Sequence, residues 1–201
     1  MNKFWFHFFY VVVWPIFHLL FPSRVVGRDN VPAAPVLLCS NHTHFTDPIY
    51  ILYAMGQKDA PTIMAKAELL RIPVLGWILK QMGVFGVDRG KSDVKAVKTA
   101  LKVLKDGKNL LVFPEGTRVK EEDSAEAKTG AAMLALRTGV PLVPIWMPAK
   151  KKLFRRTPVV FGEAYYPQGA EGARPTPEDY RRVADDLMAR IKALGEQYHG
   201  N

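Results

Sequence analysis

The segment PVLLCSNHTHFTDPIYILYAMG, residues 35–56, joins two apolar runs through a polar loop. The first run, Pro35–Asn41, is short and apolar, which is typical of a buried strand. Asp47 is a residue type favoured at helix N-caps, and Pro48 suits the first helical position. The segment therefore predicts a strand that leads through the loop NHTHFTDP into a helix at residues 48–56.

Strand-like and helix-like runs alternate through the rest of the chain. Short apolar runs typical of strands lie at residues 61–66, 83–90, 109–116, 140–148 and 157–166. Helical periodicity and cap residues predict helices at residues 72–83, 93–106 (capped by Ser92) and 129–139, and a long helix after Thr176. A polar link is expected at residues 22–30. The alternation predicts an α/β fold with a mixed, largely parallel central sheet flanked by helices, whose loops after the strands carry the chemistry.

Length and composition limit the possible functions. A chain of 201 residues is typical of one domain, so we expect a single α/β domain over residues 25–201. The formal net charge of +9 favours an anionic partner: a nucleic acid, an anionic membrane surface or a phosphorylated substrate. No nucleic-acid recognition module matches the sequence, so a nucleic-acid partner is not expected. The single cysteine, Cys39, suits a reducing compartment, and its apolar neighbours favour a buried residue over a nucleophile.

The N-terminal segment, residues 4–22, is nearly all apolar and rich in aromatic rings. A helix that spans the bilayer core needs about 20 residues, so its length allows a span. His7, Pro15 and His18 interrupt the segment, and aromatic rings favour the membrane–water interface. We therefore predict an N-terminal aromatic membrane-anchoring helix within residues 1–24, lying at the interface or inserted shallowly. A single span and a buried core helix are the alternatives.

The loop NHTHFTDP allows three interpretations. In the first, Asp47 only caps the following helix and His42 is a polar loop residue. In the second, His42, His44 and Asp47 bind zinc or iron, although the other histidines lie far along the chain. In the third, the Asp47 carboxylate orients the His42 imidazole, which acts as a general base. The residues of this loop alone leave all three open.

Cations follow several of the expected strands. Lys66 ends the run at residues 61–66, Arg89 lies at the end of the next strand, and Arg118 closes the turn FPEGTR. Within that turn Gly116 provides the backbone freedom that a tight turn needs, and Glu115 lies beside it. Three cations that leave parallel strands together indicate a candidate phosphate site.

Four short blocks occur in order between residues 36 and 145: NHTHFTDP (41–48), GVFGVDR (83–89), FPEGTR (113–118) and VPI (143–145). They resemble the four ordered blocks of the glycerolipid acyltransferases, and most closely those of the bacterial 1-acylglycerol-3-phosphate acyltransferases. The resemblance implies an enzyme of phospholipid biosynthesis that transfers a fatty acyl group from an acyl thioester to the free sn-2 hydroxyl of lysophosphatidic acid, giving phosphatidic acid. It implies no metal and no bound cofactor, because acyl-coenzyme A or an acyl-carrier protein is the donor substrate.

The resemblance also implies a role for each matching residue. His42 would be the general base, and Asp47 would hold and polarise it, with no acyl-enzyme. Arg89 and Arg118, together with Lys66, would bind the acceptor phosphate. The further matches shape the glycerol-binding loop or flank the acceptor: Glu115, Gly116 and Lys128. The family often has serine where this chain has His44, so His44 is a competing candidate for the base.

Two basic segments indicate where such an enzyme would work. Lysines repeat along the helix expected at residues 93–106, and the segment KKKLFRR, residues 150–156, places five cations around Leu153 and Phe154. A cation near an anionic leaflet contributes about 1 kcal/mol. We expect the second segment to join the N-terminal helix in binding the cytoplasmic face of the cell membrane, or to dock an acidic acyl-carrier protein.

Other functions stay open at this point. The acceptor of the acyl group could be another lysophospholipid or glycerol 3-phosphate. A metal-dependent hydrolase would use His42, His44 and Asp47 as ligands. A lipid-binding membrane adaptor would need no catalytic residue at all.

Overall fold

The computed structural model describes residues 3–88, 93–118, 127–169 and 174–200. The described strands form one sheet in the order β1–β7–β6–β2–β5–β3–β4, and neighbouring strands run parallel except β6 and β7. They are β1 (Ser23–Val26), β2 (Leu37–Ser40), β3 (Thr62–Lys66), β4 (Val84–Val87), β5 (Leu110–Val112), β6 (Leu142–Trp146) and β7 (Thr157–Phe161). The predicted mixed, largely parallel sheet is confirmed.

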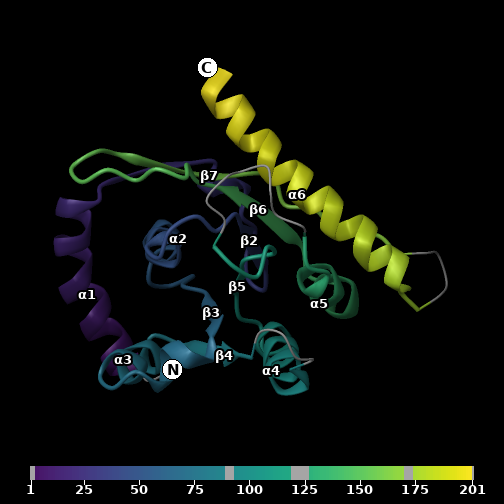
Figure 1. The fold of residues 1–201 in the computed structure, drawn as a ribbon, viewed down its shortest axis with the longest axis horizontal. Coiled ribbons are helices and arrows are strands. Elements are labelled where there is room, and N and C mark those ends of the chain that lie inside the picture. Colours follow the sequence, from purple (N-terminus) through teal and green to yellow (C-terminus); the bar gives the residue numbers. More distant parts are fainter. Residues whose placement is uncertain (1–2, 89–92, 119–126, 170–173, 201) are drawn as a thin grey trace.

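Helices cover both faces of this sheet (Figure 1). They are α1 (Lys3–Leu20), α2 (Asp47–Met55), α3 (Leu75–Gln81), α4 (Val94–Lys105), α5 (Gly130–Thr138) and α6 (Pro177–Gly200), with short 3-10 turns η1 (Arg28–Asn30) and η2 (Ala67–Arg71).

The central strand β2 shows why this sequence forms a sheet covered on both sides. Leu37 and Cys39 belong to the core cluster formed with α4, α5 and α6, whereas Val36 and Leu38 belong to the cluster formed with α2. Successive strand residues point to opposite faces, and all four of these side chains are fully buried. A strand buried on both faces is continuously apolar, which explains the unbroken run VLLC.

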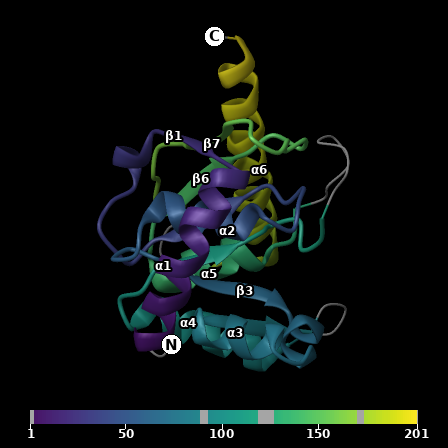
Figure 2. The same ribbon diagram turned by 90° about the vertical axis from the view of Figure 1, so that its left-hand side faces the viewer.

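Helix α1 lies along the α2 and α3 side of the body, and most of its side chains are exposed (Figure 2). Phe17 packs against Tyr50 of α2, and Trp5 packs against Trp77 of α3, each pair with ring centroids 5.0 Å apart. Among the described helices, α1 is the one long and apolar enough to cross a membrane by length and composition. Its contacts with α2 and α3 hold it against the body along its length.

The loop between β6 and β7, residues 147–156, reaches the C-terminal end of α1 (Figure 1). The backbone N–H of Phe154 donates to the carbonyl oxygen of Leu20 at 2.8 Å. At the tip of the loop Leu153 and Phe154 are 54% and 66% exposed. The exposed apolar tip of this loop therefore adjoins the exposed helix α1.

The polar link expected at residues 22–30 is wrong, because it contains β1. This strand pairs in parallel with β7, from Ser23 beside Thr157 to Val26 beside Val160. It lies at the edge of the sheet and is only four residues long, with its two middle residues exposed. Such a short edge strand has no apolar run that would reveal it.

Two helix starts test the predicted caps. Helix α4 begins after Asp93, whose carboxylate accepts a hydrogen bond from the N–H of Ala96 at 2.9 Å, so the cap expected at Ser92 is wrong by one residue. Helix α6 begins after Thr176, as predicted. The Thr176 hydroxyl accepts from the N–H of Asp179 at 3.2 Å, and the Asp179 carboxylate accepts from the N–H of Thr176 at 3.0 Å.

Candidate active site

The loops that leave the parallel strands meet at one edge of the sheet. His42 lies two residues after β2, the turn Phe113–Arg118 follows β5, and Lys151 lies in the loop after β6. Because β2 lies between β5 and β6, the three loops are neighbours. In open α/β sheets, the carboxyl ends of the strands are the usual place for a ligand site.

His42 and Asp47 form a hydrogen-bonded pair. His42 Nδ1 lies 3.0 Å from Asp47 Oδ2, and the Asp47 side chain is fully buried. The same carboxylate oxygen accepts from the backbone N–H groups of Thr43 and His44, each at 2.8 Å. Asp47 is the first residue of α2, and Thr46 is its N-cap, so the interpretation of Asp47 as only a helix cap is wrong. Its carboxylate turns back towards the histidine loop, residues 41–46, and binds His42, Thr43 and His44.

The ionisation of Asp47 fixes the state of His42. Burial raises the pKa of Asp47, but the hydrogen bond from His42 and the charge of Lys151 outweigh it, so that the pKa is lowered. An ionised carboxylate only accepts hydrogen bonds, and His42 Nδ1 therefore carries the proton in this pair. The other nitrogen, Nε2, is left as a proton acceptor, which is the arrangement of a general base and its orienting acid.

The His42 ring and backbone are held by the turn after β5. The ring stacks on Phe113, with centroids 4.1 Å apart, and the His42 side chain is only 12% exposed. The backbone N–H of His42 donates to Glu115 Oε2 at 2.8 Å. Burial raises the pKa of Glu115 to about 7, against the lowering effect of that hydrogen bond. Glu115 therefore binds the backbone of His42 itself, a contact that the sequence did not predict.

His44, the competing candidate for the base, lies in a different environment. Its Nδ1 is 2.8 Å from the hydroxyl oxygen of Thr46, and it pairs with the Asp47 carboxylate only through its backbone N–H. Burial, followed by the charge of Lys151, lowers the pKa of its imidazole. In the described part of the chain, no group of three or more His, Cys, Asp or Glu side chains is arranged to hold a metal ion. The metal-ligand interpretation of His42, His44 and Asp47 therefore has no geometric support.

Lys151 is a site residue that sequence reasoning missed. Its Nζ forms an ion pair with Asp47 Oδ1 at 2.7 Å, and both side chains are fully buried. The ammonium also donates to the Thr43 hydroxyl at 2.9 Å and to the Pro148 carbonyl oxygen at 2.8 Å. The segment KKKLFRR was expected to be a surface cluster, and this is wrong for its second lysine. Three adjacent lysines carry no signal of which one turns inward.

The residues expected to bind phosphate differ in exposure and in their partners. Lys66 is exposed and paired with Glu68, its Nζ 3.0 Å from Oε1. Arg118 is exposed at the end of the turn after β5. Lys128 lies along Gly116, because a Cβ added to that glycine would come within 3.0 Å of the Lys128 Nζ. Arg89 lies outside the described residues.

A cavity of about 400 Å³ lies between α4 and α5, close to the His42–Asp47 pair. Its lining also includes Gly116 and Lys128. Phe113 forms part of the wall and stacks on the His42 ring, so one side chain connects the cavity with the candidate base. Most of the other lining side chains are apolar, among them Met64, Val97, Val112 and Met133.

Comparison with known proteins places this geometry in a family. Residues 22–148 match the sequence profile of the family described as Acyltransferase. The chain is 30% identical over 180 residues to the 1-acyl-sn-glycerol-3-phosphate acyltransferase of Bacillus subtilis, covering 85% of this chain and 87% of that protein. It is 28% identical over 188 residues to the enzyme of that name from Pseudomonas aeruginosa, covering 87% and 72%.

Two further comparisons concern length and fold. The Brassica napus chloroplast protein of that name is 34% identical over 154 residues, which are 74% of this chain and 44% of that protein. The chain likewise spans less than half of the Arabidopsis thaliana and Borreliella burgdorferi relatives that it matches. The crystal structure of the 1-acyl-sn-glycerophosphate acyltransferase PlsC from Thermotoga maritima has the same fold, with a TM-score of 0.65 at 20% identity over 98% of this chain and 94% of that one. With more than half of its length inside the family profile, this chain belongs to the acyltransferase family.

Proposed function

We propose that this protein is a 1-acylglycerol-3-phosphate O-acyltransferase, which converts lysophosphatidic acid and an acyl thioester into phosphatidic acid. The observation that carries the proposal is the pairing of His42 Nδ1 with the buried Asp47 carboxylate at 3.0 Å, which leaves Nε2 to accept a proton. The names of relatives that match along most of their length support this choice of substrate.

The geometry supports a general-base reaction in the following steps. His42 Nε2 removes the proton from the sn-2 hydroxyl while that oxygen attacks the thioester carbonyl carbon. The new C–O bond moves an electron pair onto the carbonyl oxygen, giving a tetrahedral oxyanion. When that pair returns, the C–S bond breaks, and the thiolate takes the proton from the imidazolium. A general base contributes about 10²–10⁴-fold to such a step, and positioning of the substrates supplies much of the rest.

The cations near the turn after β5 fit the phosphate of the acceptor. Arg118 is exposed there, and Lys128 lies against the Gly116 backbone. Guanidinium and ammonium groups bind phosphate through charge-assisted hydrogen bonds, and a fixed phosphate positions the hydroxyl for attack. In this proposal Arg89 and Lys66 complete the set, with Lys66 exchanging its Glu68 partner for the phosphate.

The apolar cavity between α4 and α5 fits an acyl chain of a substrate. It is lined mainly by apolar side chains, and it begins at Phe113, next to the His42 ring. An acyl chain held there brings its head group towards the base. The donor, acyl-coenzyme A or an acyl-carrier protein, is a substrate, and in this proposal no metal or bound cofactor takes part.

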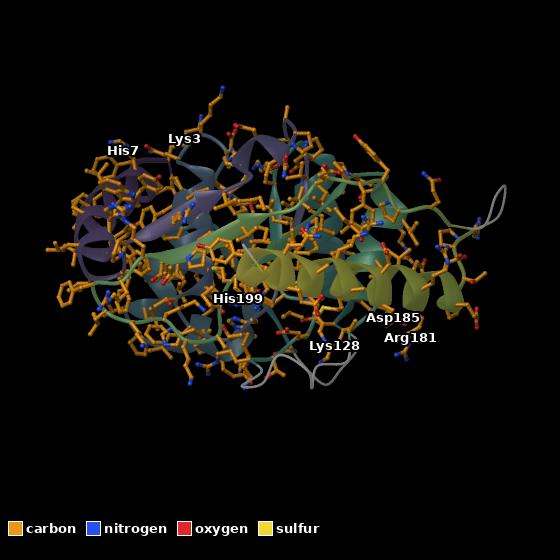
Figure 3. All side chains as sticks on the ribbon, turned by 90° about the horizontal axis from the view of Figure 1, so that it is seen from above. Lys3, His7, Lys128, Arg181, Asp185 and His199 are labelled. Carbon is orange, nitrogen blue, oxygen red and sulfur yellow. The ribbon has the colours of Figure 1, made fainter. Side chains whose placement is uncertain are left out.

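Helix α1 and the adjoining loop tip fit a membrane surface. The exposed apolar residues Leu153 and Phe154 lie beside the exposed helix α1. The neighbouring cations of residues 150–156 flank them in the sequence, and of these Lys151 is buried. Lys3 and His7 of α1 lie at one end of the molecule, and Arg181 and Asp185 of α6 lie at the other (Figure 3). We propose that α1 lies in the interface on the cytoplasmic face of the membrane, since apolar burial and basic residues together give stable attachment.

The direct test supplies the purified full chain with lysophosphatidic acid and either acyl-coenzyme A or acyl-carrier protein, in the presence of a chelator. Mass spectrometry then measures phosphatidic acid. We expect product from the wild type and a rate at least about 10²-fold lower from His42→Ala. Parallel assays with glycerol 3-phosphate and with other lysophospholipids identify the acceptor, and a clear preference for one of them would overturn the proposed substrate. Activity that disappears with the chelator would contradict the metal-free mechanism.

A further inference from the structure

Behind the His42–Asp47 pair lies a buried ammonium group that the proposed reaction does not yet use. Lys151 Nζ lies 2.7 Å from Asp47 Oδ1, on the side of the carboxylate opposite to its bond with His42. Neither side chain of this ion pair has any solvent exposure. Lysine is almost never fully buried unless it is paired, so the contact is a specific feature of the fold.

The ammonium also joins two loops. Lys151 leaves the loop after β6 and donates to the Thr43 hydroxyl of the histidine loop and to the Pro148 carbonyl of its own loop. A second contact connects the same loops: Asn41 donates to the Met147 carbonyl at 2.8 Å and accepts from the Met147 N–H at 3.0 Å. The backbone of the histidine loop is therefore already fixed by Asn41, which leaves the carboxylate itself as the group that Lys151 governs.

The energetics explain why this contact matters for the base. A buried carboxylate without compensation protonates, because desolvation disfavours its charged form. A protonated Asp47 cannot stabilise the imidazolium that forms when His42 accepts a proton. An ion pair buried in this way adds little to stability compared with apolar residues, so a functional reason for it is to be sought.

We propose that Lys151 is a positioning residue of the acyl transfer, which keeps the Asp47 carboxylate ionised and oriented towards His42. The inference rests on the proposed function, since it assigns Lys151 a part in the step in which His42 accepts a proton. Lys151 acts through Asp47 and does not touch the substrate.

The charged groups around the carboxylate determine the expected pH effect. His42 and His44 face Asp47 from its own loop, and Lys151 faces it from the loop after β6. Glu115 lies on the turn after β5, where burial and the charge of Asp47 raise its pKa, so Glu115 is the neutral member of the two acids below about pH 7. Arg118, on the turn after β5, acts on His44. Without Lys151, burial still raises the pKa of Asp47, and the hydrogen bonds from His42 and His44 remain to lower it. The low-pH limb of activity is then expected to move to higher pH, because Asp47 takes up a proton earlier on acidification.

The first experiment compares steady-state kinetics of the wild type with Lys151→Met, which keeps the length and removes the charge. By analogy with the outer hydrogen-bond partners of metal-bound histidines, which contribute about 10–100-fold, kcat is expected to fall by about that factor. The KM of each substrate changes little, and the low-pH limb of kcat/KM moves upward. Lys151→Arg, which keeps the charge, restores the position of that limb. Lys108→Met removes an exposed lysine from the loop between α4 and β5 and is expected to behave as the wild type.

A double-variant cycle tests whether Lys151 acts through Asp47. Asp47→Asn with Lys151→Met is expected to have the same kcat as Asp47→Asn alone, because the removed charge has no carboxylate left to govern. Losses that multiply would overturn the inference. So would a Lys151→Met variant with wild-type kcat, or one with a lower melting temperature and reduced kcat but an unshifted pH profile, which would indicate a structural role only.

A measurement without substrate separates this inference from the choice of substrate. The Nδ1–H proton of His42, hydrogen-bonded to a carboxylate, is followed by NMR across a pH titration and is assigned by its absence in His42→Gln. On acidification, the signal in Lys151→Met is expected to disappear at a higher pH than in the wild type, because Asp47 takes up a proton earlier. Identical titrations would overturn the role of Lys151 even if phosphatidic acid is formed, whereas a shifted titration supports it even if the acceptor proves to be a different lipid.

Discussion

Two buried carboxylates hold His42 from different sides, and their environments drive their pKa values in opposite directions. Asp47 contacts the imidazole and Lys151, and although burial raises its pKa, these partners lower it. Glu115 contacts the backbone N–H of His42, and within the described chain no cation lies at ion-pair distance from it. Burial therefore raises the pKa of Glu115 to about 7.

The difference shows that two buried acids in contact with the same histidine can have opposite pKa shifts, because Asp47 has His42 and Lys151 as partners, whereas the described partner of Glu115 is a backbone N–H. Titratable groups whose environments separate their pKa values are a usual sign of separate roles in a catalytic site. Asp47 stays ionised and orients the imidazole. Glu115 anchors the backbone of the same histidine and changes its protonation near neutral pH.

The largest effect is expected from Asp47→Asn, which keeps the shape of the side chain and removes its charge. By analogy with other acid–histidine pairs, kcat is expected to fall by about 10⁴-fold with little change in either KM. Asp106→Asn, at an exposed carboxylate paired with Lys102, serves as the control and should keep the wild-type kcat. A loss of less than tenfold in Asp47→Asn, with the fold intact by circular dichroism, would break the comparison.

Glu115→Gln tests the raised pKa of Glu115 through the pH dependence of the free energy of unfolding. The folded pKa of Glu115 is raised from its usual 4.5 to about 7, so its contribution to stability is full below pH 4.5 and is lost as the pH rises towards 7. Glutamine still accepts from the His42 N–H but does not titrate. At pH 8 the variant is expected to have a larger free energy of unfolding than the wild type, by about 3 kcal/mol, and at pH 4.5 the two should agree. Denaturant titrations that show a pH-independent difference would contradict the assignment.

Arg118→Ala contrasts an exposed cation with the buried Lys151. A hydrogen bond to a charged group contributes about 1.5–3 kcal/mol, so the KM for lysophosphatidic acid is expected to rise about 10–100-fold. The KM of the acyl donor and the shape of the pH profile are expected to stay unchanged, because in the proposed site Arg118 binds the phosphate and does not contact Asp47. Arg181→Ala, on the exposed side of α6, is the matched control. If acceptor and donor KM rise equally, Arg118 does not bind the acceptor phosphate.

The smallest effect is expected in the cavity. Val97→Phe adds bulk to its wall, whereas Val94→Phe adds the same bulk to a position on α4 that is 58% exposed. A difference of one methylene in an apolar pocket is worth about 10-fold or more, so Val97→Phe should shift the preference towards shorter acyl chains by about that factor. Competition assays with mixed acyl chain lengths measure the shift. The same preference in both variants would exclude the cavity as an acyl site.

Most of the fold could be predicted from the sequence, because local patterns specify it. The buried strand at VLLC, the helix after Asp47 and the capping box at Thr176 each have a local signature that the structure confirms. β1 has none, since its pairing depends on β7, which follows more than 130 residues later. Short edge strands are defined by their partner, and a partner distant in sequence leaves no mark on them.

The site residues that belong to one short motif could be predicted from the sequence. Those that only the tertiary structure brings together could not. The spacing of His42 and Asp47 suggested their pairing, and the structure brings them to 3.0 Å. Lys151 lies 104 residues after Asp47 and beside two other lysines, so only the adjacency of β2 and β6 reveals which lysine turns inward. The contact of Glu115 with the His42 backbone depends in the same way on β2 lying beside β5.

In the proposed mechanism, pairing with the buried Asp47 makes His42, and not His44, the base. The most direct measurement is the rate of phosphatidic acid formation by His42→Ala and His44→Ala, prepared and assayed side by side with the wild type. We expect His42→Ala to lose at least about 10²-fold in kcat, while His44→Ala keeps most of the wild-type rate. Full activity in His42→Ala, or a loss confined to His44→Ala, would contradict it.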